Sequence, residues 1–164
     1  MKTALLIVDM QNIFMHDLMK ELKVAEACEY INHVAGLLRS KGHLVVHIQD
    51  MEGAGGDADP AVREVIPEIT VDPQDIRVMK QYSNAFWQTD LEQLLRSQNV
   101  GFVIVAGFAV EHCVTFTYNG ALERDFQAAM LQKSVLSTRP EATAALYHDR
   151  HLISYPVVEF LLNK

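Results

Sequence analysis

Short apolar runs alternate with longer amphipathic segments along most of the chain. Strands of a parallel sheet are covered on both faces, so they are expected to form continuous apolar runs instead of an alternating pattern. Strands are predicted at residues 3–9, 43–49, 75–80, 101–108 and 126–132, with a last short strand at 151–154. The first, third and fourth of these runs end close to a carboxylate, an amine and a cysteine-bearing turn.

Helices are predicted between these strands. Residues 20–41 carry apolar side chains at helical spacing, and Gly42 follows as the expected stop. Residues 89–99 form another amphipathic segment, with Thr89 or Asp90 available as its N-cap. Further helices are expected at 112–124, 139–149 and 156–162, and the Gly- and Asp-rich residues 51–60 are expected to form a surface loop near a site. The alternation predicts an α/β fold, a three-layer α/β/α sandwich with a mainly parallel sheet.

Composition narrows the choice of partner. The chain has 164 residues, of which 49% are hydrophobic and 21% charged, which is typical of a single domain spanning residues 1–164. A formal net charge of −7 argues against nucleic acid and anionic membranes as partners. No apolar run approaches the ~20 residues that span a bilayer, and no export signal is recognisable. A cytoplasmic location, reduced cysteines and a small-molecule partner are therefore expected.

Candidate chemistry collects at the predicted strand ends. In open parallel sheets, ligands bind outside the carboxyl ends of the strands. Asp9, Asp50, Lys80 and the turn from Gly107 to Cys113 all fall at such ends. A helix N-terminus and a nearby ammonium would lower the pKa of the Cys113 thiol below its usual ~8.5. Asp9 could then accept the thiol proton and later act as general base toward water.

Each of these residues also has an ordinary structural explanation. Asp9 could be the first polar residue of a loop, Lys80 a surface charge and Cys113 a small core residue, since free cysteines are often buried. His112 is not expected to be the base, because neighbouring residues on a helix do not face each other. Backbone N–H groups beyond Gly107 could bind the oxyanion of a tetrahedral intermediate. Only the combination of acid, amine and thiol favours catalysis.

Three blocks of sequence carry a family resemblance. They are ALLIVDMQNIF (4–14), MKQYSNAFWQTDLEQLLRSQNV (79–100) and GFVIVAGFAVEHCVTFTYNGALERDF (101–126). In order and spacing these blocks resemble the isochorismatase-like cysteine hydrolases, a family that includes nicotinamidases, N-carbamoylsarcosine amidohydrolases and ureidoacrylate-type amidases. The resemblance covers roughly residues 3–132. It implies a Rossmann-like fold of the isochorismatase type and assembly as dimers or tetramers.

The resemblance also implies roles for individual residues. Asp9 would be the general base, Lys80 its charged partner and Cys113 the nucleophile. A cis peptide is expected between Phe108 and Ala109, which would aim the N–H groups of Ala109 and Cys113 at the oxyanion. The implied reaction is hydrolysis of a small amide or ureide C–N bond through a thioester.

Pocket walls are expected from six positions: Gln11, Phe14, Tyr82, Phe86, Trp87 and Val110. Core packing is an equally good explanation for Phe14 and Phe86. Val110 and Glu111 stand where the family commonly has a small residue or Thr followed by Asp or Asn. In this chain, therefore, no side-chain hydroxyl or amide at positions 110 and 111 is expected to contact the substrate.

A metal cofactor is not expected. Nicotinamidases carry an Asp-x-His metal motif after the second strand, and here Asp50 is followed at that spacing by Glu52. We therefore predict no zinc and no other cofactor, and a surface role for the pair His148 and His151. The main alternative to an enzyme is a non-catalytic member of the family that binds a small ligand or a partner protein. A redox-sensing thiol is less favoured, because Cys28 is poorly placed to resolve an oxidised Cys113.

Overall fold

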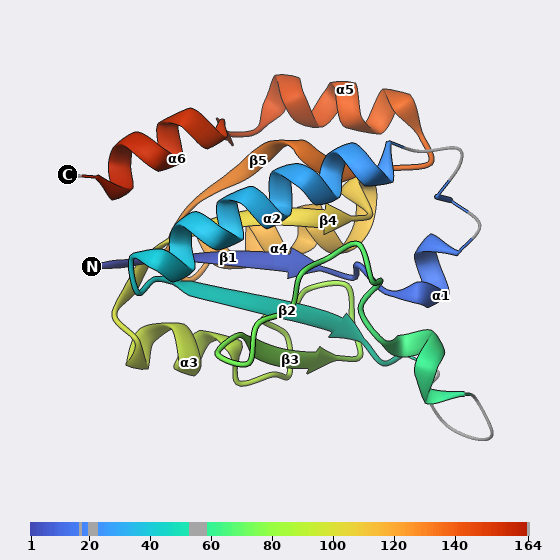
Figure 1. The fold of residues 1–164 in the computed structure, drawn as a ribbon, viewed down its shortest axis with the longest axis horizontal. Helices are drawn as coiled ribbons and strands as arrows, with labels where there is room; N and C mark the ends of the chain where they lie inside the picture. Colours follow the sequence, from blue (N-terminus) through green and yellow to red (C-terminus); the bar gives the residue numbers. More distant parts are fainter. Residues whose placement is uncertain (17, 20–22, 53–58, 164) are drawn as a thin grey trace.

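The computed structural model describes residues 1–16, 18–19, 23–52 and 59–163. Its centre is a six-stranded sheet of order β3-β2-β1-β4-β5-β6, in which every strand pairing is parallel (Figure 1). The strands are β1 (Lys2–Val8), β2 (Leu44–Asp50), β3 (Ile76–Lys80), β4 (Val100–Phe108), β5 (Gln127–Leu136) and β6 (Leu152–Ile153). The predicted α/β sandwich is confirmed, with an entirely parallel sheet instead of a mainly parallel one.

Helices cover both faces of this sheet. They are α1 (Asn12–Met15), α2 (Val24–Ser40), α3 (Leu91–Ser97), α4 (Thr115–Leu122), α5 (Pro140–Asp149) and α6 (Tyr155–Leu162), with a 3-10 turn η1 (Pro60–Arg63) and a π turn η2 (Val110–Val114). Buried side chains of α2 and α6 pack on one face, and those of α3, α4 and α5 belong to the core of the other. None of the helices within the described ranges is long and apolar enough to cross a membrane.

The first strand shows why the sheet's apolar runs are continuous. Leu5 and Ile7 point into the core beneath α2, whereas Leu6 and Val8 point into the core on the opposite face. Successive side chains of a strand alternate between faces, so a strand covered on both sides needs apolar residues at every position. β1 is paired with β2 on one edge and β4 on the other, which places its carboxyl end at the middle of the sheet.

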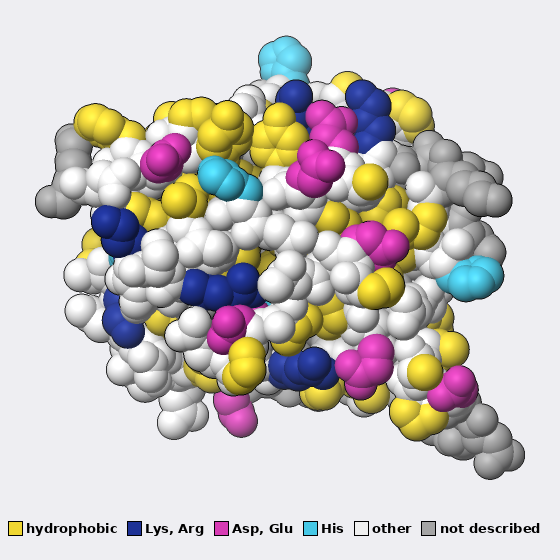
Figure 2. Space-filling model, viewed as in Figure 1, with side chains coloured by type: hydrophobic (Ala, Val, Ile, Leu, Met, Phe, Trp, Pro, Cys, Tyr) yellow, Lys and Arg dark blue, Asp and Glu magenta, His cyan; other side chains and the backbone are white. Residues whose placement is uncertain are grey.

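Helix α6 is covered only in part. Val158 is buried, but four apolar side chains of this helix are 38% to 60% exposed: Tyr155, Val157, Phe160 and Leu161. Figure 2 shows apolar side chains at the surface over this helix, at the upper left of the view.

Several boundaries differ from the predictions. The helix predicted at 112–124 begins as a regular helix only at Thr115, because His112 has non-helical dihedral angles (φ −126°, ψ −106°) inside η2. α1 and η1 are too short to leave a periodic pattern and were not predicted. Strand β5 runs on to Leu136. Residues 20–22 of the predicted first helix and 53–58 of the predicted loop lie outside the described residues.

Candidate active site

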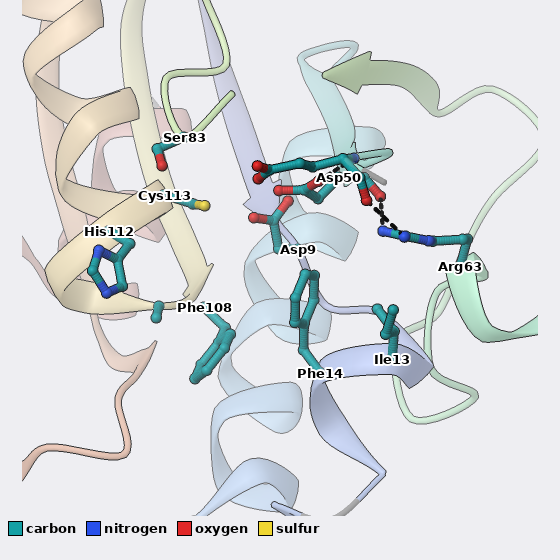
Figure 3. Close-up of a pocket in the computed structure, with 11 residues that line it drawn as sticks. Asp9, Ile13, Phe14, Asp50, Arg63, Ser83, Phe108, His112 and Cys113 are labelled. Carbon is teal, nitrogen blue, oxygen red and sulfur yellow. Dashed lines mark hydrogen bonds between the residues drawn. The ribbon is translucent and has the colours of Figure 1, made fainter. Parts of the chain in front are cut away.

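Four side chains converge at the carboxyl ends of adjacent strands. Asp50 and Lys80 end β2 and β3 and are register partners, while Asp9 directly follows the neighbouring β1. Cys113 comes from η2, the turn after β4 on the other side of β1. Figure 3 shows the Asp9 carboxylate and the Cys113 sulfur on facing walls of one cavity. The structure therefore brings together the three residues that the sequence singled out as acid, amine and thiol.

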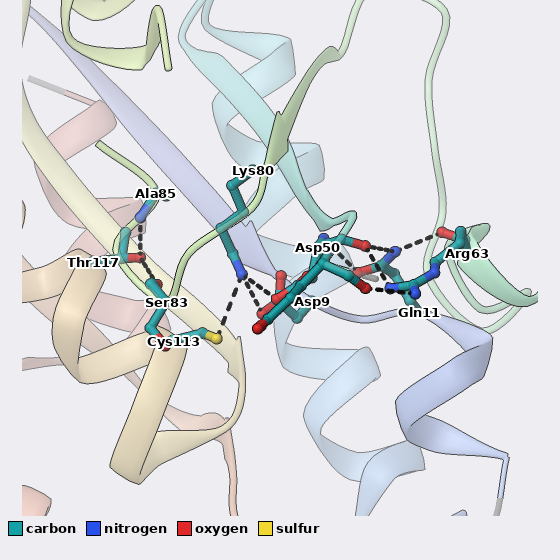
Figure 4. Close-up of polar contacts among 10 residues, drawn as sticks. Asp9, Gln11, Asp50, Arg63, Lys80, Ser83, Ala85, Cys113 and Thr117 are labelled. Atoms are coloured by element: carbon teal, nitrogen blue, oxygen red, sulfur yellow. Dashed lines mark hydrogen bonds and ion pairs between the residues drawn. The ribbon is translucent and has the colours of Figure 1, made fainter. Parts of the chain in front are cut away.

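Lys80 is the centre of this group. Its Nζ lies 2.9 Å from Asp9 Oδ2, 2.8 Å from Asp50 Oδ2 and 3.4 Å from Cys113 Sγ (Figure 4). The Lys80 residue is 1% exposed, so the ammonium has little access to water. Burying a cation is costly unless anions are in contact with it, and here two carboxylates meet that need.

Burial and charge set the protonation of Asp9 and Lys80. Burial raises the pKa of Asp9 to about 6, although the Lys80 ammonium opposes this rise. Burial lowers the pKa of Lys80, but the charge of Asp9 and the thiol outweigh it, so that the pKa is raised overall. The Lys80 ion pair and a hydrogen bond with the Cys113 side chain both oppose the rise in the Asp9 pKa. Asp9 is therefore in position to accept the thiol proton.

The resting state of Cys113 differs from the prediction. Burial, the largest cause, and the charge of Asp9 together raise the pKa of the Cys113 thiol to about 12, and Lys80 only partly opposes them. Besides burial, two features make the prediction of a lowered pKa wrong. The sulfur lies close to a carboxylate as well as an ammonium, and it sits in the irregular π turn instead of the first turn of a regular helix. The thiol therefore keeps its proton at rest and needs a base to react.

The chain between β4 and Cys113 has the expected backbone. The peptide bond between Phe108 and Ala109 is cis, as the family resemblance predicted. Gly107 has φ +114°, and a Cβ added there would lie 2.1 Å from the backbone oxygen of Val8. Only glycine fits this close approach of β4 to β1. The turn that carries Cys113 is therefore fixed against the strand that carries Asp9.

A cavity of about 340 Å³ lies over these residues. Asp9, Asp50 and Cys113 form part of its lining, and the rings of Phe14 and Phe108 form another part (Figure 3). The two ring centroids are 6.0 Å apart at an interplanar angle of 38°. The volume lies within the ~300–1,000 Å³ range of small-molecule sites.

Of the six expected pocket residues, Phe14 lines this cavity. Gln11 lies behind the wall, fully buried: its Nε2 donates to Asp50 O (3.2 Å) and Arg63 O (2.7 Å), and its Oε1 accepts from Asp50 N (2.7 Å). Gln11 thus fastens the end of β2 to η1.

The other four residues lie elsewhere. Phe86 is buried and stacks on Phe126 with centroids 6.0 Å apart, so the core explanation applies to it. Val110 is buried and faces a separate cavity of about 210 Å³ between η2 and α5. Tyr82 and Trp87 are 47% and 53% exposed, and neither is part of the lining of the 340 Å³ cavity.

The structure adds wall residues that the sequence did not indicate as such. Arg63 lines the cavity from η1, with Nη1 donating to Asp50 O (3.2 Å) and Nη2 to Glu52 O (2.7 Å). Glu52 lines it too, just beyond β2, and Ser83 and the exposed His112 complete the polar part of the lining. A short turn in a loop has no periodicity, so the sequence carries no signal that would place Arg63 at the site.

The donor atoms at this site already hold a cation. The carboxylates of Asp9 and Asp50 and the sulfur of Cys113 lie within 4.8 Å of one another, and such atoms can bind metal ions. The Lys80 ammonium contacts all three, so a metal ion could enter only by displacing it. With Lys80 in place, this set of residues does not fit a metal.

Comparison with known proteins agrees with this architecture. The isochorismatase domain model matches residues 3–153, and the chain therefore belongs to the isochorismatase family of hydrolases.

Among its relatives is the uncharacterized isochorismatase family protein YrdC of Bacillus subtilis (strain 168), which is 32% identical over 71% of this chain and 64% of that protein. Streptothricin hydrolase of Streptomyces noursei is 35% identical over 73% of this chain and 44% of that protein. The chain thus spans less than two thirds of either relative.

Solved structures share the fold. An isochorismatase family protein from Desulfovibrio vulgaris subsp. vulgaris str. Hildenborough superposes with a TM-score of 0.85 over 99% of both chains, at 18% identity. N-carbamoylsarcosine amidase from Thermoplasma acidophilum superposes with a TM-score of 0.78 over 94% of this chain and 95% of that one, at 24% identity.

Proposed function

We propose that this chain is a cysteine hydrolase that cleaves the C–N bond of a small amide or ureide through a thioester, without a metal ion. The observation that supports this most is the contact of the Lys80 ammonium with Asp9, Asp50 and Cys113 beside a cavity of small-molecule size. An acid, an amine and a thiol in mutual contact can move a proton and stabilise the charges that result.

The first half of the reaction makes the thioester. Asp9 takes the proton of the Cys113 thiol as the sulfur attacks the carbonyl carbon, and the carbonyl electrons move onto oxygen. Lys80 stabilises the thiolate as it forms. The N–H groups of Ala109 and Cys113 are the proposed oxyanion donors. When the intermediate collapses, the C–N bond breaks and the leaving nitrogen takes the proton from Asp9.

The second half returns the enzyme to its resting state. Asp9, again ionised, takes a proton from water as the water oxygen attacks the thioester carbonyl. The C–S bond breaks, the acid is released and the Cys113 sulfur regains a proton. A pKa of about 6 suits Asp9 to this role, because the carboxylate is mostly ionised at neutral pH and still accepts a proton readily.

The name of one similar structure agrees with a C–N bond as the target. It is an N-carbamoylsarcosine amidase, which falls within the class that the resemblance predicted. A relative, streptothricin hydrolase, is named as a hydrolase of a small molecule.

The test is release of ammonia or amine from a panel of small amides and ureides. We expect Cys113→Ala and Asp9→Asn each to lower turnover by at least about a thousandfold while circular dichroism stays unchanged. Cys28→Ala is the matched control, since Cys28 lies on the buried face of α2, in the core on the sheet face covered by α2 and α6, and should be dispensable for turnover. Full turnover in either site variant would disprove the mechanism.

A second candidate function is binding of a small ligand without catalysis. The raised pKa of Cys113 favours it, because a thiol that keeps its proton is a poor nucleophile unless Asp9 acts. Glu111 also favours it, because its carboxylate accepts a hydrogen bond from Ser137 Oγ (2.7 Å) and is engaged away from the cavity. Ligands that stabilise the protein but are never hydrolysed would support this alternative.

A further inference from the structure

The charged groups around the 340 Å³ cavity do not balance. The carboxylates of Asp9, Asp50 and Glu52 line it, while the cations are Arg63 in the wall and Lys80 beside Asp9. Among the Asp, Glu, Lys and Arg side chains, three carboxylates against two cations leave one excess negative charge; His112 also lines the cavity. The neighbouring residues Ile13, Phe14 and Phe108 add no charge to the lining.

The two cations are already engaged by the protein. Lys80 Nζ contacts both Asp9 and Asp50. Both Nη groups of Arg63 donate to backbone carbonyls, those of Asp50 and Glu52. A guanidinium normally binds a substrate carboxylate through two parallel N–H bonds, and here each Nη of Arg63 already donates one bond to a backbone carbonyl.

One carboxylate, in contrast, is left for a ligand. Asp50 accepts from Lys80 Nζ at 2.8 Å through Oδ2 and from the Glu52 N–H at 2.7 Å through Oδ1. The Glu52 side chain is exposed at the cavity and has no hydrogen bond or ion pair with any residue in the described part of the chain. Asp9 is 1% exposed and interacts with both Lys80 and the Cys113 side chain.

The excess charge persists through the proposed reaction. Moving the proton from Cys113 to Asp9 replaces the carboxylate anion with a thiolate. Attack of the sulfur then replaces the thiolate with an oxyanion on the substrate, so the total charge does not change. A substrate carboxylate would therefore meet an anionic site at every step, whereas an ammonium or guanidinium group would neutralise it.

We infer that this site selects small amides or ureides that carry a positive charge over uncharged ones, and rejects those that carry a carboxylate, with Glu52 as the residue that sets this preference. The inference rests on the proposed function, since it takes Cys113 to be the point of reaction. It specifies the substrate class that the proposed function left open.

The test measures charge preference without turnover. Methanethiosulfonates transfer a small group to a thiolate, which forms a mixed disulfide and releases methanesulfinate. Three reagents are compared, with ethylammonium, methyl and ethylsulfonate as the transferred groups. The rate of labelling at Cys113 is read by peptide mass spectrometry, and the same ratios for the urea-unfolded chain serve as reference.

We expect the labelling rate with the ethylammonium reagent, divided by the rate with the ethylsulfonate reagent, to be about tenfold larger at folded Cys113 than in the unfolded chain. Glu52→Gln should reduce that excess several-fold. Glu123→Gln, the matched control, removes an exposed charge at the far end of α4 and should leave the excess unchanged.

A ratio equal to that of the unfolded chain, or a preference for ethylsulfonate, would overturn the inference by showing that Arg63 and Lys80 dominate the cavity. Failure of all three reagents to label Cys113 would overturn the inference and the proposed function together, because the thiol would then react with no group that enters the cavity. A clear charge preference without hydrolysis of any amide would support the selectivity and count against the proposed function, so the two failures are distinguishable.

Discussion

Replacing Lys80 with methionine would remove the cation that two buried carboxylates share. Methionine is close to the lysine stem in length, so packing changes little, but Asp9 and Asp50 lose the ammonium at 2.9 Å and 2.8 Å. Both residues are nearly inaccessible, at 1% and 6% exposure. Breaking a buried ion pair by removing one partner costs about 3–5 kcal/mol, because it leaves an uncompensated charge behind. We expect a loss of that size in the free energy of unfolding at about pH 7.5.

The loss should depend on pH in a defined direction. The pKa of Asp9 is already raised from 3.8 to about 6, and Lys80 holds it below the value that burial alone would give. Without Lys80 this pKa rises further, so the folded state of the variant binds a proton more tightly than the unfolded state does. Stability is then retained at low pH and lost as the pH rises through the folded pKa. At about pH 5 the loss should shrink to about 1–2 kcal/mol, since protonated Asp9 needs no counter-charge.

The assay is urea unfolding followed by circular dichroism at the two pH values. Lys41→Met is the matched control, because Lys41 is exposed after the end of α2 and should change stability by less than about 0.5 kcal/mol. A loss below about 1 kcal/mol at the higher pH, or an equal loss at both, would refute the view that Lys80 compensates buried charge.

Three other predictions test separate features. Asp50→Asn should move the acid limb of kcat/KM, expected near pH 6, to lower pH, because the charge of Asp50 contributes to the raised pKa of Asp9; an upward shift in the pH profile would contradict this. Asp75→Asn should lower the free energy of unfolding by about 2–4 kcal/mol. The buried carboxylate of Asp75 accepts two hydrogen bonds from Arg39 (2.9 Å and 2.6 Å) and contacts His47 Nε2 (2.9 Å), so an unchanged midpoint of thermal unfolding would contradict this prediction. We also propose that the chain forms a homo-oligomer through α6, so Val157→Asp should lower the mass measured by light scattering, and an unchanged mass would exclude this helix from the interface.

The sheet could be predicted from the sequence because burial on both faces leaves an unmistakable pattern. A run such as residues 101–108 permits few other structures, and the parallel arrangement then brings Asp9, Lys80 and the Cys113 turn to one edge. The exposed positions of Tyr82 and Trp87 could not be predicted, since a segment without periodicity says nothing about its orientation.

The sequence predicted which residues form the catalytic group better than it predicted their protonation states and the cavity wall around them. The pKa of Cys113 depends first on how deeply the sulfur is buried, and then on the balance between the Asp9 carboxylate and the Lys80 ammonium, which changes over distances of a few ångströms. Arg63 reaches the cavity because Gln11 Nε2 holds its backbone oxygen at 2.7 Å, a contact between distant parts of the chain. Glu52 could be noticed in the sequence only as a replacement for histidine.

Because β1 lies in the middle of the sheet, its two edges are paired at different stages of synthesis. Its pairing with β2 becomes possible once residue 50 has left the ribosome, but its other edge must wait for β4, which ends at residue 108. Until then the backbone groups on that edge lack their native partners, and long-range pairing of this kind is slow. A chain interrupted before β4 would hold Asp9, Asp50 and Lys80 but no nucleophile. Synthesis thus supplies the charged residues of the site first and the reactive thiol last.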